Sequence, residues 1–122
     1  MSLNEKQQNL CESHSYDFSG LSAIILNCTL KSSHEPSHTD ALLQVPNAIL
    51  RQNSVSCEII RPVDFELAPG VMPDMTEHGA SKDDWPSLSK KVMGADILIL
   101  ATPIWLGEES SVCRKSYRAV IR

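Results

Sequence analysis

The sequence contains none of the features that mark a membrane-spanning, secreted or nucleic-acid-binding chain. No apolar run approaches the ~18 residues that a membrane-spanning helix needs. The first residues are polar where the apolar segment of a signal peptide would begin. Basic residues form only short pairs and the net charge is −4, whereas binding through nucleic-acid phosphates needs a basic face. We therefore expect a cytoplasmic protein whose partners include neither a membrane nor a nucleic acid.

Closely spaced cysteine pairs are also missing. The four cysteines, Cys11, Cys28, Cys57 and Cys113, are far apart and form no C-x-x-C motif. Cys28 and Cys57 lie in apolar runs typical of strands, where a free thiol behaves as a small hydrophobic side chain. Because intracellular proteins seldom carry disulfides, we expect reduced and buried thiols.

The length and composition are sufficient for one folded domain. The chain has 122 residues, of which 42% are hydrophobic and 21% charged, as in ordinary globular proteins. Residues 1–20 are polar and show no hydrophobic periodicity, which predicts a flexible N-terminal extension. The domain itself is expected over residues 21–122.

Three short apolar runs alternate with three helical segments in this domain. Residues 21–26, 55–62 and 96–101 are predicted strands, and the first and third lack the alternation of a half-exposed strand. Helices are predicted from 41 to 54, from 85 to 94 and from 112 onward. The candidate helix caps are Ser37 or Thr39, Asp83 or Asp84, and Ser110 or Ser111. Pro46 is expected to kink or divide the first of these helices.

This alternation predicts an α/β fold with a parallel sheet and helices on both faces. In a flavodoxin-like sheet the strand order begins 2-1-3, and ligands bind beyond the carboxyl ends of the first and third strands. The loop after the first predicted strand, with residues 29–33 and 37–39, offers hydroxyls, a lysine and the free N–H groups of a helix start. These groups are suited to a phosphate, although a plain capped helix start in a polar loop would look the same.

The loop after the third predicted strand has the sequence Thr-Pro-Ile-Trp-Leu-Gly over residues 102–107. Trp105 can lie flat against a planar ring, and Gly107 allows a close approach of the backbone. The alternative is that Trp105 only packs on the neighbouring helix.

The two loops together carry a resemblance to a known family. The segments AIILNCTLKSSHEPSHTDALL and ADILILATPIWLGEESSVCRK, with Asp83-Asp84-Trp85-Pro86 between them, resemble the NADPH-dependent FMN reductase family of the flavodoxin-like superfamily. The resemblance covers about residues 21–120 and implies a three-layer αβα fold. One departure is Glu109, which stands where relatives often have Pro.

The resemblance also implies a cofactor and a set of binding residues. FMN would be the cofactor, NADPH or NADH the hydride donor, and a small molecule the electron acceptor. No side chain would be catalytic and no metal would bind, because the flavin carries the chemistry. Relatives often form homo-oligomers, and we expect one here. The residues implied around the FMN phosphate are Thr29, Lys31, Ser37, His38 and Thr39, and those along the isoalloxazine ring are Pro103, Ile104, Trp105, Leu106 and Gly107.

A complete flavodoxin-like domain has five strands, and this sequence provides three. The third predicted strand would then form an exposed apolar edge, which predicts association. An incomplete domain leaves two alternatives to a reductase: a non-catalytic flavin-binding or electron-transfer module, and an inactive truncated remnant.

Four other motifs suggest different functions, and each lacks the context that it needs. Residues 34–38 read His-Glu-Pro-Ser-His, but Pro36 opposes the continuous helix that a zinc peptidase requires. A receiver domain needs an aspartate after the third strand, where Thr102 stands. Residues 87–90 match S-x-x-K without its companion motifs, and the glycosylation sequon at 27–29 ends a buried strand.

Overall fold

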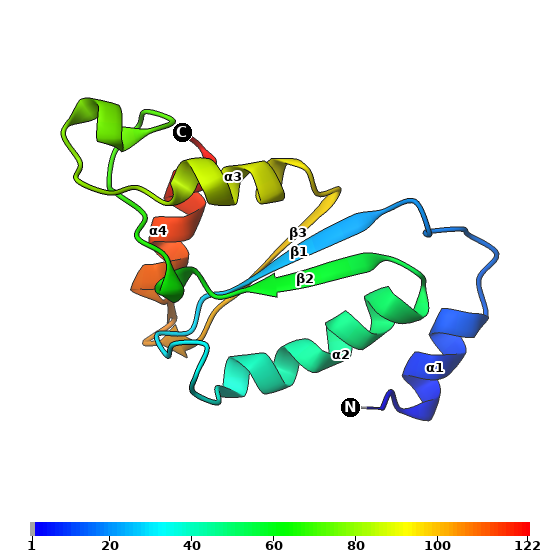
Figure 1. Cartoon of the computed structure of the whole chain (residues 1–122). Helices are drawn as coiled ribbons and strands as arrows, with labels where there is room; N and C mark the ends of the chain where they lie inside the picture. Colours follow the sequence, from blue (N-terminus) through cyan, green and yellow to red (C-terminus); the bar gives the residue numbers. More distant parts are fainter. Residues whose placement is uncertain (1) are drawn as a thin grey trace.

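The computed structural model describes residues 2–122 of the chain. Figure 1 shows three strands side by side, with α2 on one face of the sheet and α3 and α4 on the other. The elements in chain order are α1 (Glu5–Glu12), β1 (Ser22–Asn27), α2 (His38–Gln52), β2 (Ser56–Ile60), the 3-10 helices η1 (Pro62–Asp64) and η2 (Met75–His78), α3 (Trp85–Met93), β3 (Ile97–Ala101), β4 (Ile104–Trp105), β5 (Glu108–Glu109) and α4 (Ser111–Val120).

The central strand of the main sheet is β1. Ala23 pairs in parallel with Cys57 of β2 on one side and with Ile97 of β3 on the other. The strand order is therefore β2-β1-β3. This arrangement confirms the predicted α/β fold with a parallel sheet in the order 2-1-3, and it places the ends of β1 and β3 next to each other.

Each face of the sheet carries an apolar core, and β1 contributes to both. Ala23 and Ile25 pack on Leu43 of α2. Ile24 and Leu26 belong to the core formed with α3 and α4. Because side chains of a strand point alternately to the two faces, a strand covered on both must be apolar at every position. This explains the uninterrupted apolar run that predicted β1.

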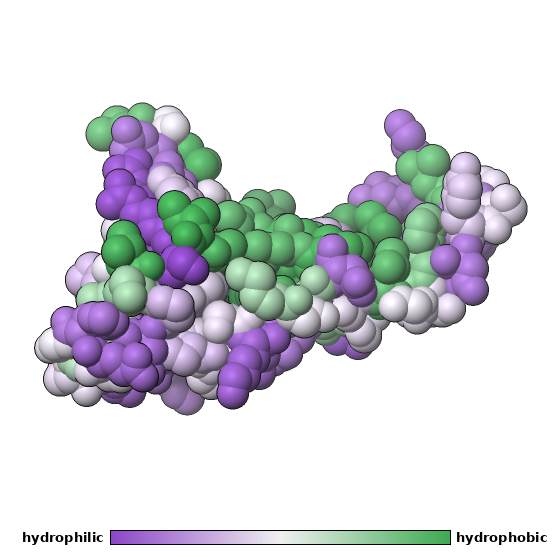
Figure 2. Space-filling view, turned by 90° about the horizontal axis from the view of Figure 1, so that it is seen from above, coloured by the Kyte–Doolittle hydropathy of each residue, from purple (hydrophilic) through white to green (hydrophobic). Residues whose placement is uncertain are grey.

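The edge strand β3 is covered on one face only. Ile97 and Ile99 pack on the core beneath α2. Leu98 and Leu100 pair with Ile24 and Leu26 of β1, on the face of α3 and α4, and each remains 38% exposed. Figure 2 shows hydrophobic side chains gathered along one concave side of the molecule. The predicted exposed apolar edge is thus confirmed, and the association expected from it stays a prediction.

The helices α2, α3 and α4 start where their predicted caps stand. Ser37, Asp84 and Ser110 are the N-cap residues. Pro46 does not divide the first predicted helix, because α2 runs from His38 to Gln52 with Pro46 inside it; the other expectation, that Pro46 kinks the helix, stays a prediction. Proline removes the N–H that would bond to the carbonyl of Leu42, and Leu42 is 76% exposed, so water can hydrate the freed carbonyl.

The N-terminal segment contains a helix that the sequence analysis does not predict. Asn4 caps α1 by accepting the N–H of Gln7, whose side chain bonds back to the N–H of Asn4. Such a capping box stabilises a helix start even where the following residues have no apolar face. Farther along, Phe18 packs on the core beneath α2. The flexibility expected for residues 1–20 stays a prediction, but the segment is not without structure.

None of the helices found between residues 2 and 122 combines the length and the hydropathy needed to cross a membrane.

Candidate functional site

The carboxyl ends of β1 and β3 bring the two predicted binding loops together. Asn27 is paired in parallel with Ala101, the last residue of β3. The N–H of Cys28 then donates to the carbonyl of Ala101 over 2.7 Å, so the two chains are still joined as they leave the sheet. This is the position between β1 and β3 at which a ligand is expected in an open parallel sheet.

The loop from β1 to α2 is shaped by its own polar side chains. Asn27 is fully buried, and its side-chain oxygen accepts the N–H of Thr29 over 3.2 Å. The hydroxyl of Thr29 in turn accepts the N–H of Lys31, and the amine of Lys31 reaches the carbonyl of Pro36. Thr29 is only 5% exposed. It therefore shapes the loop from inside, whereas Lys31 lies on its exposed surface.

The loop ends at the N-terminus of α2, where three more predicted residues follow one another. The hydroxyl of Ser37 accepts the N–H of Asp40 over 2.9 Å. His38 is exposed and Thr39 is half-buried, and both lie in the first turn. The first turn of a helix leaves N–H groups without helical partners and carries a partial positive charge. Such a helix start is suited to an anion, and the assignment of these residues to a phosphate stays a prediction.

Arg61, directly after β2, holds this loop closed, and the sequence analysis does not single it out. Its guanidinium donates to the carbonyls of Ser32 and Glu35, the latter over 2.7 Å, and lies 3.4 Å from the carbonyl of Lys31. It also lies 3.9 Å from a carboxylate oxygen of Asp40, and its side chain is 10% exposed. Short sequence motifs do not indicate this role of Arg61, because its hydrogen-bond partners lie about thirty residues away in the sequence.

The loop after β3 forms a hairpin, which the sequence analysis also does not predict. Trp105 of β4 pairs in antiparallel fashion with Glu108 of β5. Leu106 and Gly107 form the turn, with φ values of 52° and 79°. Positive φ at both positions is typical of the tightest hairpin turns, and Gly107 is a usual residue there whereas Leu106 is not. Within this apolar segment, Gly107 is the residue that favours a turn.

The apolar side chains of this hairpin project into solvent. Ile104 is 60% exposed, Trp105 is 53% exposed and Leu106 is completely exposed, while Pro103 is half-buried. Trp105 is therefore not a core residue, and the alternative that it only packs on the neighbouring helix stays a prediction. Three neighbouring exposed apolar residues on a turn with an uncommon backbone conformation favour a contact with a ligand or a partner.

Ser110 joins the two loops to α4. Its hydroxyl donates to the carbonyl of Cys28 over 2.7 Å and accepts the N–H of Cys113 over 3.0 Å. Its own N–H donates to the hydroxyl of Thr102 over 2.9 Å. Ser110 is 1% exposed. One buried serine therefore fixes the relative position of the two predicted binding loops, a role beyond that of a helix cap.

Glu109 is held at the base of the hairpin. Its carboxylate accepts hydrogen bonds from Nε of Arg114 over 2.9 Å and from the hydroxyl of Tyr117 over 3.1 Å. The bond from Arg114 is the main reason that the pKa of Glu109 lies below its usual value. The departure from proline at this position is therefore accommodated by an ion pair with α4.

The His-Glu-Pro-Ser-His segment does not lie on one helix. His34 and Glu35 are in the loop, and α2 begins only at His38, after the cap Ser37. The two histidines therefore do not share a helix face, as the zinc-peptidase motif requires.

Comparison with known proteins gives a family match and flavin-related relatives. The model of the family described as NADPH-dependent FMN reductase matches residues 23–114. The 8-demethyl-8-aminoriboflavin-5′-phosphate synthase of Streptomyces davaonensis is 33% identical over 91 residues, which are 70% of this chain and 35% of that protein. A crystal structure of RosB with a bound intermediate, 8-demethyl-8-formylriboflavin-5′-phosphate, aligns with a TM-score of 0.68 and 31% identity, over 78% of this chain and 40% of that one.

A third relative has a name that does not refer to a flavin. The divalent metal cation transporter MntH of Mycobacterium bovis is 49% identical over 98 residues, which are 80% of this chain but 14% of that protein. The chain thus spans less than half the length of each of these relatives. The family match, which extends over both binding loops and the sheet between them, shows that the chain belongs to the NADPH-dependent FMN reductase family.

Proposed function

We propose that this chain binds FMN at the carboxyl ends of β1 and β3 and acts as a flavin oxidoreductase. In this role hydride from NADPH or NADH passes by way of the bound flavin to a small-molecule acceptor. The observation that carries the proposal is the junction of the two loops, which Ser110 joins by its bonds to Cys28 and Thr102. Two relatives support a flavin as the ligand, since one is named for the synthesis of a riboflavin phosphate and the other is a structure with a riboflavin phosphate bound.

The loop between β1 and α2 fits the phosphate of FMN. Lys31 provides a cation on the exposed surface, and Ser37, His38 and Thr39 provide hydroxyl, imidazole and N–H groups at the start of α2. A dianionic phosphate is favoured by a helix N-terminus and by a nearby lysine. Thr29 contributes through the shape of the loop, because its hydroxyl is already occupied by the N–H of Lys31.

The hairpin fits the isoalloxazine ring. Ile104, Trp105 and Leu106 offer exposed apolar surface next to the phosphate loop, and Pro103 and Gly107 complete the segment. When bound, the flavin supplies the hydride chemistry, and the chain has to orient the ring and shield one side of it from water. The exposed indole of Trp105 is suited to stacking against that ring.

Flavin fluorescence tests this proposal directly. The full chain is titrated into FMN and, separately, into riboflavin, which lacks the phosphate. Saturable quenching of FMN together with much weaker binding of riboflavin is expected, because the loop before α2 recognises the phosphate. Equal affinity for the two flavins, or no quenching of either, would contradict the assigned site.

The hairpin is tested with one substitution and a matched control. Trp105→Ala is expected to weaken FMN binding about three- to tenfold, as for the loss of one aromatic stacking contact. Tyr16→Ala removes another largely exposed aromatic residue, far from both loops in the sequence, and is expected to leave FMN binding unchanged. Addition of NADPH to the FMN complex without oxygen then separates a reductase, which bleaches the flavin, from a non-catalytic flavin-binding module, which does not.

A further inference from the structure

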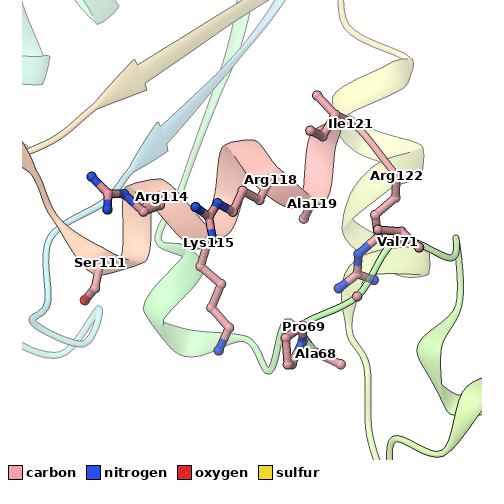
Figure 3. Close-up of a pocket in the computed structure, with 11 residues that line it drawn as sticks. Ala68, Pro69, Val71, Ser111, Arg114, Lys115, Arg118, Ala119, Ile121 and Arg122 are labelled. Carbon is pink, nitrogen blue, oxygen red and sulfur yellow. The ribbon is translucent and has the colours of Figure 1, made fainter.

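A cavity lies outside the two flavin loops, between α4 and the loop that follows η1. Its volume is about 570 Å³, within the range of small-molecule sites. Ala68, Pro69 and Val71 of this loop and Ile121 at the end of α4 form its apolar wall, and Lys115 and Arg118 of α4 also line it. Figure 3 shows the side chain of Lys115 extending from α4 toward Ala68 and Pro69. None of the residues assigned to FMN lines this cavity.

The cavity has basic side chains although the chain as a whole is acidic. Its lining contains Arg114, Lys115, Arg118 and Arg122 and no Asp or Glu, whereas the net charge of the chain is −4. Arg114 is paired with Glu109 and Glu108. Lys115 and Arg118 form no ion pair with any of residues 2–122. Two uncompensated cations three residues apart on one helix therefore face the same space.

A buried ion pair fixes the far end of the cavity. The guanidinium of Arg122 donates to a carboxylate oxygen of Asp83 over 2.6 Å, and both side chains are buried. Asp83 also accepts the N–H of Ala68 over 3.2 Å and that of Met75 over 3.1 Å. The end of α4 and the loop that forms the apolar wall are thus held by one carboxylate, so the cavity has a defined shape without a ligand.

Arg122 also carries a donor without an acceptor. Its side chain is 2% exposed and lines the cavity, and no residue of the described chain accepts a hydrogen bond from its Nε. Figure 3 shows this guanidinium beside Val71, where α4 approaches the loop. A buried donor without an acceptor is costly, so within residues 2–122 this end of the cavity is held by the ion pair with Asp83 alone.

We propose that this cavity binds a small organic phosphate. The phosphate would lie between Lys115 and Arg118, because a dianion is matched by two cations that have no other partner. The organic part would lie on the apolar wall formed by Ala68, Pro69, Val71 and Ile121. An inorganic anion leaves this wall unused, and an uncharged apolar molecule leaves the two cations unused. The combination of both surfaces favours a molecule that carries an apolar or aromatic group together with a phosphate.

Titration calorimetry on the full chain tests this specificity. The probes are 1-naphthyl phosphate, 5′-AMP, 1-naphthol and inorganic phosphate. At least one of the two organic phosphates is expected to bind about tenfold or more tightly than both 1-naphthol and inorganic phosphate, since only it uses both surfaces. Preference for 5′-AMP would indicate a nucleotide, and preference for 1-naphthyl phosphate an apolar phosphate ester. Equally weak binding of all four probes would overturn the proposal.

Substitutions assign the binding to this cavity. The double variant Lys115→Gln with Arg118→Gln is expected to lose about tenfold or more of the affinity for the organic phosphate. Its affinity for FMN is expected to remain unchanged, which separates this site from the flavin loops. Lys6→Gln on α1 removes a lysine that does not line the cavity and serves as the control.

An independent variant guards against a folding defect. Val71→Glu places a negative charge on the apolar wall at a side chain that is 80% exposed, so the fold is not disturbed. Its circular dichroism is expected to match that of the parent chain and its affinity for the organic phosphate to fall. Binding that is unchanged in both the double variant and Val71→Glu would contradict the assignment.

Discussion

The replacement of Arg61 by methionine tests how the proposed phosphate loop is built. Methionine keeps much of the apolar stem of arginine and removes the guanidinium. That group is the donor to the carbonyls of Ser32 and Glu35, and it lies close to the carbonyl of Lys31. The side chain is 10% exposed, so the guanidinium is shielded from water while it makes these bonds. The loop between β1 and α2 would lose its main attachment to β2.

The expected loss of stability follows from the number and type of these bonds. A hydrogen bond from a charged donor contributes about 1.5–3 kcal/mol, and two short bonds to the loop are removed together. Because the freed carbonyls can partly rehydrate at an exposed loop, we expect a decrease of about 2–4 kcal/mol in the free energy of unfolding. FMN affinity is expected to fall about tenfold or more, since the loop must then be ordered by the ligand.

Urea denaturation followed by circular dichroism measures the first effect, and FMN fluorescence measures the second. Arg51→Met is the matched control. Arg51 also donates from its guanidinium to a backbone carbonyl, that of Cys57 over 2.9 Å, but it lies at the end of α2. It is expected to reduce stability without changing FMN affinity. If Arg61→Met lowers stability and leaves FMN affinity intact, the loop between β1 and α2 does not bind the phosphate.

Three further predictions concern the core, the sheet edge and the pH dependence. Iodoacetamide is expected to modify Cys11 in the folded chain and the three buried cysteines only after unfolding. Burial also raises the pKa of the Cys28 thiol to about 12, which leaves it unreactive in the folded chain. Mass spectrometry checks this, and rapid labelling of Cys28 would contradict it. Leu100→Lys on the 38% exposed edge is expected to shift the chain from an oligomer to a monomer in sedimentation equilibrium. Asp83→Asn is expected to lower the free energy of unfolding by about 3 kcal/mol at pH 7, because it leaves a buried Arg122 without its charged partner. Urea titrations of the parent chain and of this variant at pH 7 and pH 3 should show that the difference becomes smaller in acid.

The acid sensitivity of the Asp83 contribution has a definite sign. Burial alone would raise the pKa of Asp83, but hydrogen bonds from Met75, Arg122, Trp85 and Ala68 together hold it below its usual value. Since the pKa is lower in the folded than in the unfolded chain, the stabilisation is complete above the unfolded value of about 3.9. It disappears as the pH falls through the folded value. A difference between the two chains that is the same at pH 3 as at pH 7 would refute this reasoning.

The sequence predicts the central strand well because a strand buried on both faces leaves a clear pattern. The apolar run at β1 indicates burial on two sides, and α2 and α3 together with α4 provide it. The helix starts at Ser37, Asp84 and Ser110 were predictable for a similar reason, since a cap is a local signal. The helix α1 was missed because its residues have no apolar face, although the Asn4–Gln7 capping box is a local signal for a helix start.

The contacts that hold the candidate site together were not predictable, because their partners are far apart in the sequence. Arg61 reaches a loop about thirty residues earlier, and Ser110 reaches the carbonyl of Cys28 across 82 positions. Periodicity and short motifs report only on neighbouring residues. The sequence therefore identifies which loops meet, from the strand order, but not which side chains fix them relative to each other.

The two halves of the candidate site differ in how firmly they are held, and this has a consequence for flavin recognition. The phosphate loop is fixed by Asn27, Arg61 and the cap Ser37, all within the fold. The hairpin presents Trp105 and Leu106 to solvent, and beyond the bond between Ser110 and Thr102 at its base it is joined to α4 through the two glutamates of β5. A preformed loop loses little entropy on binding, whereas an exposed hairpin must be ordered by its ligand. Most of the affinity for FMN should therefore come from the phosphate, and the preference for FMN over riboflavin should exceed the effect of removing Trp105.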